Sequence, residues 1–303
     1  MQDLYVTGVE VLTAHGLGTS QLPDIENLSS LAGTTVPDLS PAAYGYKGLK
    51  RLSRASRLSC LAIGQALQEV GLDLSRGRKS ADSRTGFLVG SNHSNLDAIA
   101  ELYHESQTYG PRKVNPGIFP ETVLNVIGGH AAIYFGLSGV NVTISNGRDT
   151  GIKSLAYACS LLREEQLARV VVAIVNLLPP DVFETAVRAS LPSFESVVVL
   201  VLESGEESSR RRRLAKLDVQ RAAETGSSVG GQLVSAEHAV LASAIALREL
   251  TSGSQSTIRL LSSCCTEGDY LITLEAAREN LHTNWPVPDV GTLRNGVELD
   301  EKR

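Results

Sequence analysis

Apolar positions along the chain follow two periods, which predict alternating strands and helices. Short runs rich in Val, Ile and Leu predict strands at residues 4–12, 85–90, 140–144, 170–175, 197–202, 214–219 and 271–274. Apolar residues at helical spacing predict helices at residues 49–70, 121–135, 150–166 and 235–250. This order is typical of an α/β protein in which the pattern begins a second time.

The same pattern divides the chain into parts of unequal length. Residues 1–190 hold the first set of elements, and residues 191–275 hold a shorter second set. Residues 20–47 are rich in Ser, Pro and Gly and lack periodicity, so we expect a surface excursion there. Residues 276–303 are polar and end in a run of charges, which predicts a partly ordered tail.

The stretch at residues 139–176 forms a strand, a tight turn, a helix and a second strand. Asn146 and Gly147 interrupt the first strand, and the helix follows within a few residues. Many enzymes hold a nucleophile at an elbow of this kind, because the turn exposes a side chain beside the unpaired N–H groups of the helix. In this sequence the elbow presents Arg148.

Composition narrows the function classes. The 303 residues are 42% hydrophobic and 20% charged with a net charge of −5, which fits a globular protein and argues against nonspecific binding to nucleic acid or membranes. No apolar run reaches the roughly 18 residues that span a bilayer, and the first residues do not begin a secretory signal. The cysteines at 60, 159, 264 and 265 have neither metal-ligand spacing nor a plausible disulfide framework, so we expect a cytoplasmic protein without a bound metal.

Several motifs, weak individually, occur in an informative order. They are VTGVEVLTAHGLG, RLSRASRLSCLAIGQALQEVGLD, TGFLVGSN, NPGIFPETVLNVIGGHAAIYFGLSGVNVTIS, ARVVVAIVN and VVVLVLES. Together they resemble the β-ketoacyl synthases, over residues 4–203 and most strongly over residues 114–175. The resemblance implies a thiolase-like fold of α-β-α-β-α layers, here with an abbreviated second half, and an obligate dimer.

The resemblance also implies a degenerate active site. Where the family has Ser-Thr-Ala-Cys-Ala-Ser-Gly this chain has residues 145–151, so Arg148 stands at the position of the catalytic cysteine. A guanidinium is permanently protonated and cannot act as a nucleophile. The stretch after Asp218 is too short to carry the first of the family's two histidines, and Gln232 stands at the place of the second, with His238 out of register. Residues 263–267 replace the glycine-rich loop that closes the family's site.

A ketosynthase fold without its nucleophile resembles the chain length factor of type II polyketide synthases. By that resemblance the partner is a catalytic β-ketoacyl synthase subunit in a heterodimer, which acts on chains tethered to an acyl carrier protein, and no cofactor is needed. The short second half resembles the small factors of reducing systems that make polyenes. Two alternatives remain: a malonyl carrier protein decarboxylase of the same fold, and a stand-alone acyl-binding homodimer.

The resemblance assigns two groups of functional residues. The first would line or cap the acyl tunnel and consists of Gly117, Ile118, Phe119, Thr122, Val126 and Gly129. The second would form the strand that pairs across the dimer and consists of Val140, Asn141, Val142, Thr143, Ile144 and Ser145.

Structural roles compete with functional ones at four further places. Arg148 could simply pair with an acid, from Asp149 or from elsewhere, and His130 is expected to be a satisfied core histidine. Arg210 to Arg213 could attract an acidic carrier protein, but a solvated face is the simpler interpretation. A hydrolase triad of Ser91, His93 and Asp97 lacks a nucleophile elbow, and we discount it.

Overall fold

The computed structural model of the protein describes residues 2–72, 83–164, 167–209, 211–222, 231–264 and 268–277. Its centre is a ten-stranded mixed sheet in the order β4-β3-β5-β6-β1-β7-β10-β9-β8, with β2 paired to β1. The strands are β1 (Leu4–Thr13), β2 (Gly16–Leu17), β3 (Thr85–Ser91), β4 (Asn141–Ile144), β5 (Arg169–Asn176), β6 (Ser196–Ser204), β7 (Ala215–Arg221), β8 (Gln232–Ser235), β9 (Thr257–Ser263) and β10 (Tyr270–Ala276). The α-helices are α1 (Arg54–Glu69), α2 (Leu96–Tyr109), α3 (Val126–Phe135), α4 (Thr150–Arg163), α5 (Asp181–Val187), α6 (Gly205–Ser208) and α7 (Ala239–Thr251).

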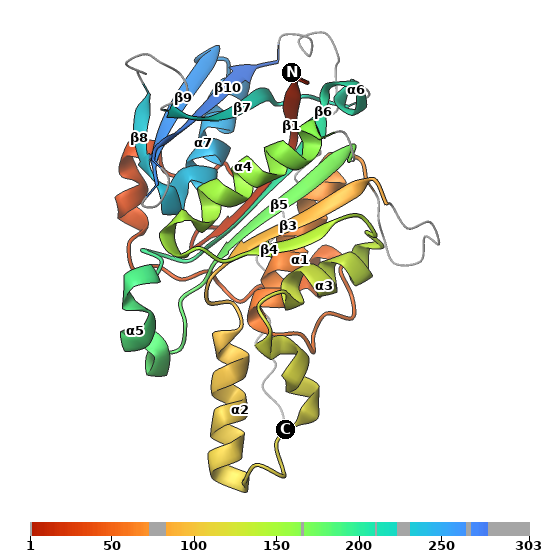
Figure 1. Ribbon diagram of the computed structural model, residues 1–303, viewed down its shortest axis with the longest axis vertical. Helices are drawn as coiled ribbons and strands as arrows, with labels where there is room; N and C mark the ends of the chain where they lie inside the picture. Colours follow the sequence, from red (N-terminus) through yellow and green to blue (C-terminus); the bar gives the residue numbers. More distant parts are fainter. Residues whose placement is uncertain are drawn as a thin grey trace, which may run out of the picture.

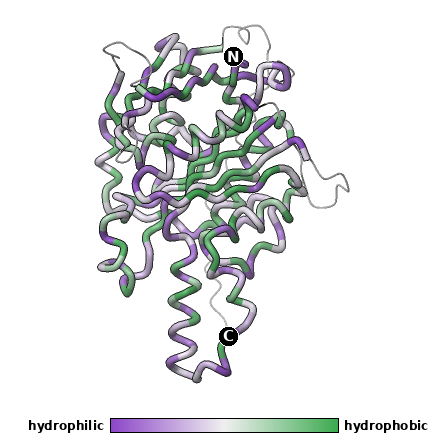
Figure 2. Tube along the Cα trace, in the orientation of Figure 1, coloured by the Kyte–Doolittle hydropathy of each residue, from purple (hydrophilic) through white to green (hydrophobic). Residues whose placement is uncertain are grey.

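The first half of the sheet is covered on both faces. Helices α1 and α3 lie on one face, and α4 lies on the other (Figure 1). Strands β3 and β6 are buried along their whole length, and β5 is buried except at its last residue, which is why they appear in the sequence as continuous apolar runs. Hydrophobic positions are accordingly concentrated along these strands (Figure 2). Two separate cores result, one on each face.

The second half repeats the strand order of the first and lacks its outermost strand. Across the sheet the first half has the order β4-β3-β5-β6-β1, so that its earliest strand in the chain, β1, lies innermost. The second half has the order β8-β9-β10-β7, which is the same arrangement without a strand corresponding to β4. Helix α7 lies beside α4 between the two halves (Figure 1). Residues of β7, β9 and β10 alternate between buried and more exposed, as expected of strands covered on one face.

Four of the expected layers are therefore present, in the order helix, strand, helix, strand. Among the residues that the structure describes, no helix covers the far face of the second half. This arrangement agrees with the predicted layered α/β fold and its abbreviated second half.

Strand β1 joins the halves, because its residues Leu4 to Val6 pair with both β6 and β7. A register shift between Val6 and Gly8 bends the strand at this point. At Gly8 a Cβ would lie 2.7 Å from the Val70 side chain and 3.0 Å from the Ala66 carbonyl, so the close approach of α1 requires glycine.

Several expectations from the sequence need correction. The helix expected from residue 121 begins at Val126, and a 3-10 helix, η3 (Pro116–Thr122), precedes it. Thr122 therefore does not share a helix face with Val126 and Gly129. Strand β6, assigned to the second half, lies between β5 and β1 in the first.

Other elements were missed or underestimated. Helices α2 and α5 and strand β9 were not predicted. Residues 20–47 are more than a surface excursion, since Leu22, Ile25, Leu28 and Leu31 belong to the core. The predicted tail lies outside the described residues from residue 278 onward. No described helix has the length and apolar character needed to cross a membrane.

Candidate active site at the elbow

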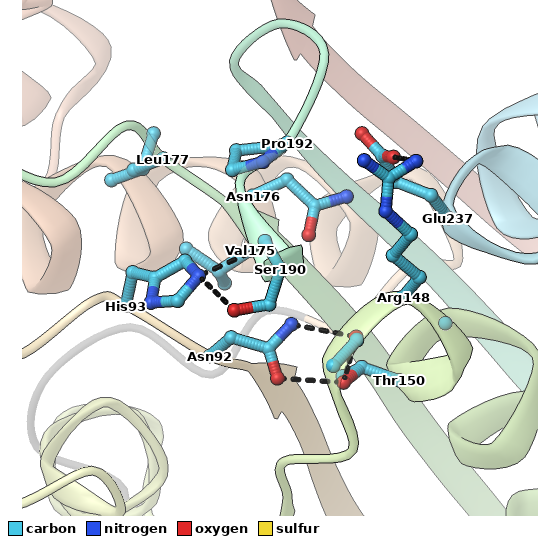
Figure 3. Close-up of a pocket in the computed structure, with 12 residues that line it drawn as sticks. Asn92, His93, Arg148, Thr150, Val175, Asn176, Leu177, Ser190, Pro192 and Glu237 are labelled. Carbon is cyan, nitrogen blue, oxygen red and sulfur yellow. Dashed lines mark hydrogen bonds and ion pairs between the residues drawn. The ribbon is translucent and has the colours of Figure 1, made fainter. Parts of the chain in front are cut away.

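Asn92, just beyond β3, fixes the elbow between β4 and α4. Its Nδ2 donates to the Gly147 carbonyl at 2.8 Å, and its Oδ1 accepts from the Thr150 hydroxyl at 2.9 Å (Figure 3). The same Oδ1 accepts from the Ser145 hydroxyl at 3.1 Å. The Asn146 N–H donates to the Thr150 hydroxyl at 2.8 Å. Gly147 has a φ of +54°, a conformation that β-branched or bulky residues rarely adopt. The sequence therefore builds a rigid turn that opens into the 3-10 helix η4 (Gly147–Asp149) and then α4.

Arg148 points from this elbow toward Glu237 (Figure 3). Its side chain is 54% exposed, its Nη1 lies 3.9 Å from Glu237 Oε2, and its Nε donates to the Ala189 carbonyl at 3.2 Å. Asp149 is not its partner: that carboxylate is buried and accepts a hydrogen bond from Cys264 Sγ at 3.3 Å. The acid therefore comes from elsewhere in the chain, the second of the two sources expected.

Glu237, like Asn92, is a residue of this site that the sequence did not indicate. Burial raises the pKa of Glu237, but the nearby His238, a hydrogen bond from the Ser193 N–H and the charge of Arg148 outweigh burial and lower it. The Ser193 N–H lies 2.6 Å from Oε1, and His238 Nε2 lies 3.2 Å from the same oxygen. The sequence indicated only its neighbour, His238, as a histidine out of register with the second histidine of the family.

His93 closes the opposite side of the elbow. Its Nε2 lies 2.9 Å from the Ser190 carbonyl and 3.3 Å from the Ser190 hydroxyl. Ser91 Oγ is buried without a hydrogen-bond partner, so the discounted triad is not assembled. Asp97 lies near Arg54. Burial raises the pKa of Asp97, and the charge of Arg54 partly opposes that increase.

The cavity at the elbow is nearly filled. It is lined by Asn92, His93, Gly147, Arg148, Thr150, Gly151, Val175, Asn176, Leu177, Ser190, Pro192 and Glu237, and its volume is about 10 Å³. That space holds about one water molecule. The segment at residues 188–193, held by Arg148, His93 and Glu237, leaves no room for an acyl thioester in this conformation.

Gln232 does not lie among the residues that line this cavity. It begins β8, opposite Leu260 in the sheet, whereas Glu237, five positions further along the chain, lines the cavity. His238 stacks on Phe194 with ring centroids 4.6 Å apart. Residues 265–267, in the segment expected to replace the family's closing loop, lie outside the described residues.

The predicted tunnel residues occupy a separate region. Gly117, Ile118, Phe119 and Thr122 lie on η3, which packs against the protruding helix α2 (Figure 1). Phe119 is 66% exposed. On α3, Val126 is buried, and Gly129 faces open space, with no atom within 4 Å of the position of a Cβ.

The predicted dimer strand is one end of the sheet. Strand β4 pairs in parallel with β3 and has no strand on its other side among the described residues. Phe87 N–H donates to the Val140 carbonyl at 2.7 Å, so the alternation of a parallel ladder directs the backbone groups of Asn141 and Thr143 toward the free edge. Ser145 follows the strand and bonds to Asn92. A free edge of this kind is a template for another chain.

The arginine run is largely engaged within the molecule. Arg211 lies 3.0 Å from the buried Glu203 carboxylate. Arg213 covers the Tyr5 ring at 4.1 Å from its centroid and donates to the Gly205 carbonyl at 2.8 Å. A solvated face is therefore not the full account of this run, of which Arg210 lies outside the described residues. In the described ranges, no group of three His, Cys, Asp or Glu residues could hold a metal.

Comparison with known proteins identifies the family that this chain resembles. The model of the β-ketoacyl synthase N-terminal domain matches residues 33–194. The 3-oxoacyl-[acyl-carrier-protein] synthase 2 of Vibrio harveyi is 29% identical over 140 residues, which are 46% of this chain and 33% of that protein. The synthase of the same name from Vibrio cholerae is 33% identical over 98 residues, which are 32% of this chain and 23% of that protein. The matched stretch thus spans a third or less of these relatives.

Solved structures share the fold over a larger part of the chain. The ishigamide ketosynthase/chain length factor matches with a TM-score of 0.68 at 18% identity, over 90% of this chain and 99% of that one. A type II polyketide synthase acyl-carrier protein in complex with its ketosynthase bound to the hexaketide matches with a TM-score of 0.72 at 15% identity, over 91% and 100% of the two chains. At these identities the likeness concerns the fold alone. With the family model covering more than half of its length, the chain belongs to the β-ketoacyl synthase family and has its thiolase-like fold.

Proposed function

We propose that this protein is a noncatalytic chain length factor. It pairs through β4 with a catalytic β-ketoacyl synthase and shapes the tunnel in which that enzyme extends a polyketide on an acyl carrier protein. The observation that carries the proposal is the elbow, where a guanidinium occupies the exposed turn at the beginning of α4 and the adjoining cavity has a volume of about 10 Å³. A permanently protonated side chain in a filled site has no means to attack a thioester.

The rest of the molecule supports an assembly role. The family fold, the free edge of β4 and the exposed apolar side chains of Phe119 and Ile133 provide what a partner subunit would cover. The short second half resembles the small factors of reducing systems, and on that basis the proposed product is a polyene. Mass spectrometry of the product tests that assignment.

Reconstitution tests the assembly. The protein alone should form no acyl-enzyme with acyl or malonyl carrier protein, whereas co-expression with its ketosynthase should yield a heterodimer that releases polyketide. Decarboxylation of malonyl carrier protein by the protein alone would instead establish the decarboxylase. A homodimer indifferent to the ketosynthase would establish an acyl-binding role.

The tunnel assignment has its own test. Ile118→Trp should shorten the products of the complex, because the larger side chain would fill space beside the growing chain. The matched control is Val182→Trp, which enlarges an exposed apolar residue on α5. Val126→Trp is a poorer probe, since Val126 is buried and overpacking typically costs about 1–3 kcal/mol. An unchanged product length with Ile118→Trp would refute the tunnel assignment.

A further inference from the structure

The segment that carries Ile118 and Phe119 has one buried residue, and it is charged. Within η3 only Glu121 is buried, at 7% exposure. The neighbouring Phe119 side chain is 66% exposed. Burial of a carboxylate costs free energy unless hydrogen bonds and opposite charge compensate, so its partners indicate what it does.

Two different helices hold the Glu121 carboxylate. Oε1 lies 2.7 Å from His130 Nε2 on α3, and Oε2 accepts from the Ser56 hydroxyl on α1 at 3.0 Å. Ser53, the N-cap of α1, donates to the Ser56 hydroxyl at 3.0 Å. Burial raises the pKa of Glu121, but hydrogen bonds from His130 and Ser56 and the charge of His130 outweigh burial and lower it. The group is therefore held ionised. His130 has a hydrogen-bond partner, as the sequence predicted, but it is half-buried and does not lie in the core.

The remainder of the segment is fastened to α2. The Asn115 N–H donates to Glu105 Oε2 at 2.7 Å, and the Asn115 side chain accepts from the Gly117 N–H at 2.9 Å. At the other end, Asn95 Nδ2 donates to the Thr122 carbonyl at 2.8 Å. Ile118 and Phe119 thus lie between fixed points, and Glu121 is the residue through which the segment is bonded to the body of the protein.

We propose that Glu121 is a positioning residue that sets where Ile118 and Phe119 stand, and thereby the chain length that the complex permits. This inference rests on the proposed chain-length role of the η3 segment. An apolar residue could fill the same space, but its contacts would be non-directional. The carboxylate has directional bonds to α1 and α3, and these fix the segment in one place relative to both helices.

The test compares Glu121→Ala and Glu121→Gln with the control Glu101→Ala, which removes an exposed carboxylate on α2. In the reconstituted complex, Glu121→Ala should at least double the spread of product lengths while total product stays within twofold of wild type. Glu121→Gln should restore a distribution close to wild type, because its amide can accept from His130 and donate to Ser56. Glu101→Ala should leave the distribution unchanged.

A second measurement needs no partner. In the isolated protein, Glu121→Ala should speed amide hydrogen exchange of residues 116–123 at least tenfold, with exchange in α7 unchanged. If Glu121→Ala alters neither exchange nor product spread, or if Glu121→Gln fails to rescue the spread, Glu121 does not position the segment. These failures are distinct from failure of the chain-length role itself, in which Ile118→Trp would leave the products unchanged.

Discussion

Among individual side chains, Glu10 on β1 shows how strongly the fold alters an ionisable group. The pKa of Glu10 is raised to about 7, because burial and the charge of Glu69 raise it by more than a hydrogen bond from the Val11 N–H lowers it. Burial also raises the pKa of Glu69, although a hydrogen bond from the Val9 N–H partly opposes the increase. Two carboxyl groups of like charge are thus held near the bend of β1.

This pairing predicts a stability difference that depends on pH. Because the pKa of Glu10 in the folded protein lies above its unfolded value of about 4.5, the stability that this group contributes is greatest below pH 4.5. That contribution is lost as the pH rises through about 7. Glu10→Gln removes this loss and should raise the free energy of unfolding at pH 8 by about 3 kcal/mol, with the gain disappearing near pH 4.5. Urea titrations at the two pH values measure it, and the exposed Glu26→Gln is the control. An equal effect of Glu10→Gln at both pH values would contradict the assignment.

At the scale of elements, a buried ionic cluster ties β5 and β6 to α6. Arg169 and Glu203 are almost fully buried and bond to each other. Arg169 also bonds to Thr85 at 3.0 Å and to Glu207 at 3.3 Å, and Arg211 approaches Glu203 at 3.0 Å. Arg211, from the arginine run, therefore helps to anchor this corner of the sheet.

Removing one partner of such a cluster leaves a buried charge poorly compensated. Arg169→Met should lower the free energy of unfolding by about 3 kcal/mol, measured by urea titration. Arg84→Ala serves as the matched control, since its largely exposed side chain reaches Glu207 only at 3.5 Å, and it should cost less than about 1 kcal/mol. If the two variants lost equal free energy of unfolding, burial of the cluster would not determine how much it contributes to stability.

At the scale of the whole molecule, the free edge of β4 is the surface through which the proposed heterodimer would form. The backbone of Val140 and Val142 serves the β3 ladder, whereas that of Thr143 is directed outward. The isolated chain can therefore fold without using the hydrogen-bonding groups that a partner strand would need.

Proline substitution separates the two uses of this strand. Thr143→Pro should leave the thermal unfolding temperature within a few degrees of wild type and abolish copurification with the ketosynthase, because proline removes a donor from the free edge. Val142→Pro should instead lower the unfolding temperature, since it removes a donor to β3. A Thr143→Pro variant that still forms the complex would place the interface elsewhere.

The pattern of apolar residues was sufficient to predict the buried strands β3, β5 and β6 and the presence of helices α1 and α4, which cover them. Residues 170–175 and 197–202 are apolar throughout because both faces of their strands are buried. Helix α2 was missed because only Ala98 is buried on it, which leaves little apolar periodicity to detect. The start of α3 was misplaced because Pro120 and Glu121 belong to a separate 3-10 helix.

The sequence by itself determined the α/β class, the elbow and the presence of Arg148 at its tip, since each follows from local pattern and order along the chain, and the layered arrangement followed from the resemblance to a known family. Only the tertiary structure decided which acid faces Arg148, that the cavity beside it is nearly filled, and that Glu121 joins η3 to α1 and α3. Glu237 and Arg148 are 89 positions apart in the sequence. Contacts over such separations depend on how β1 joins the two halves and how α4 and α7 pack between them, and local periodicity carries no record of either.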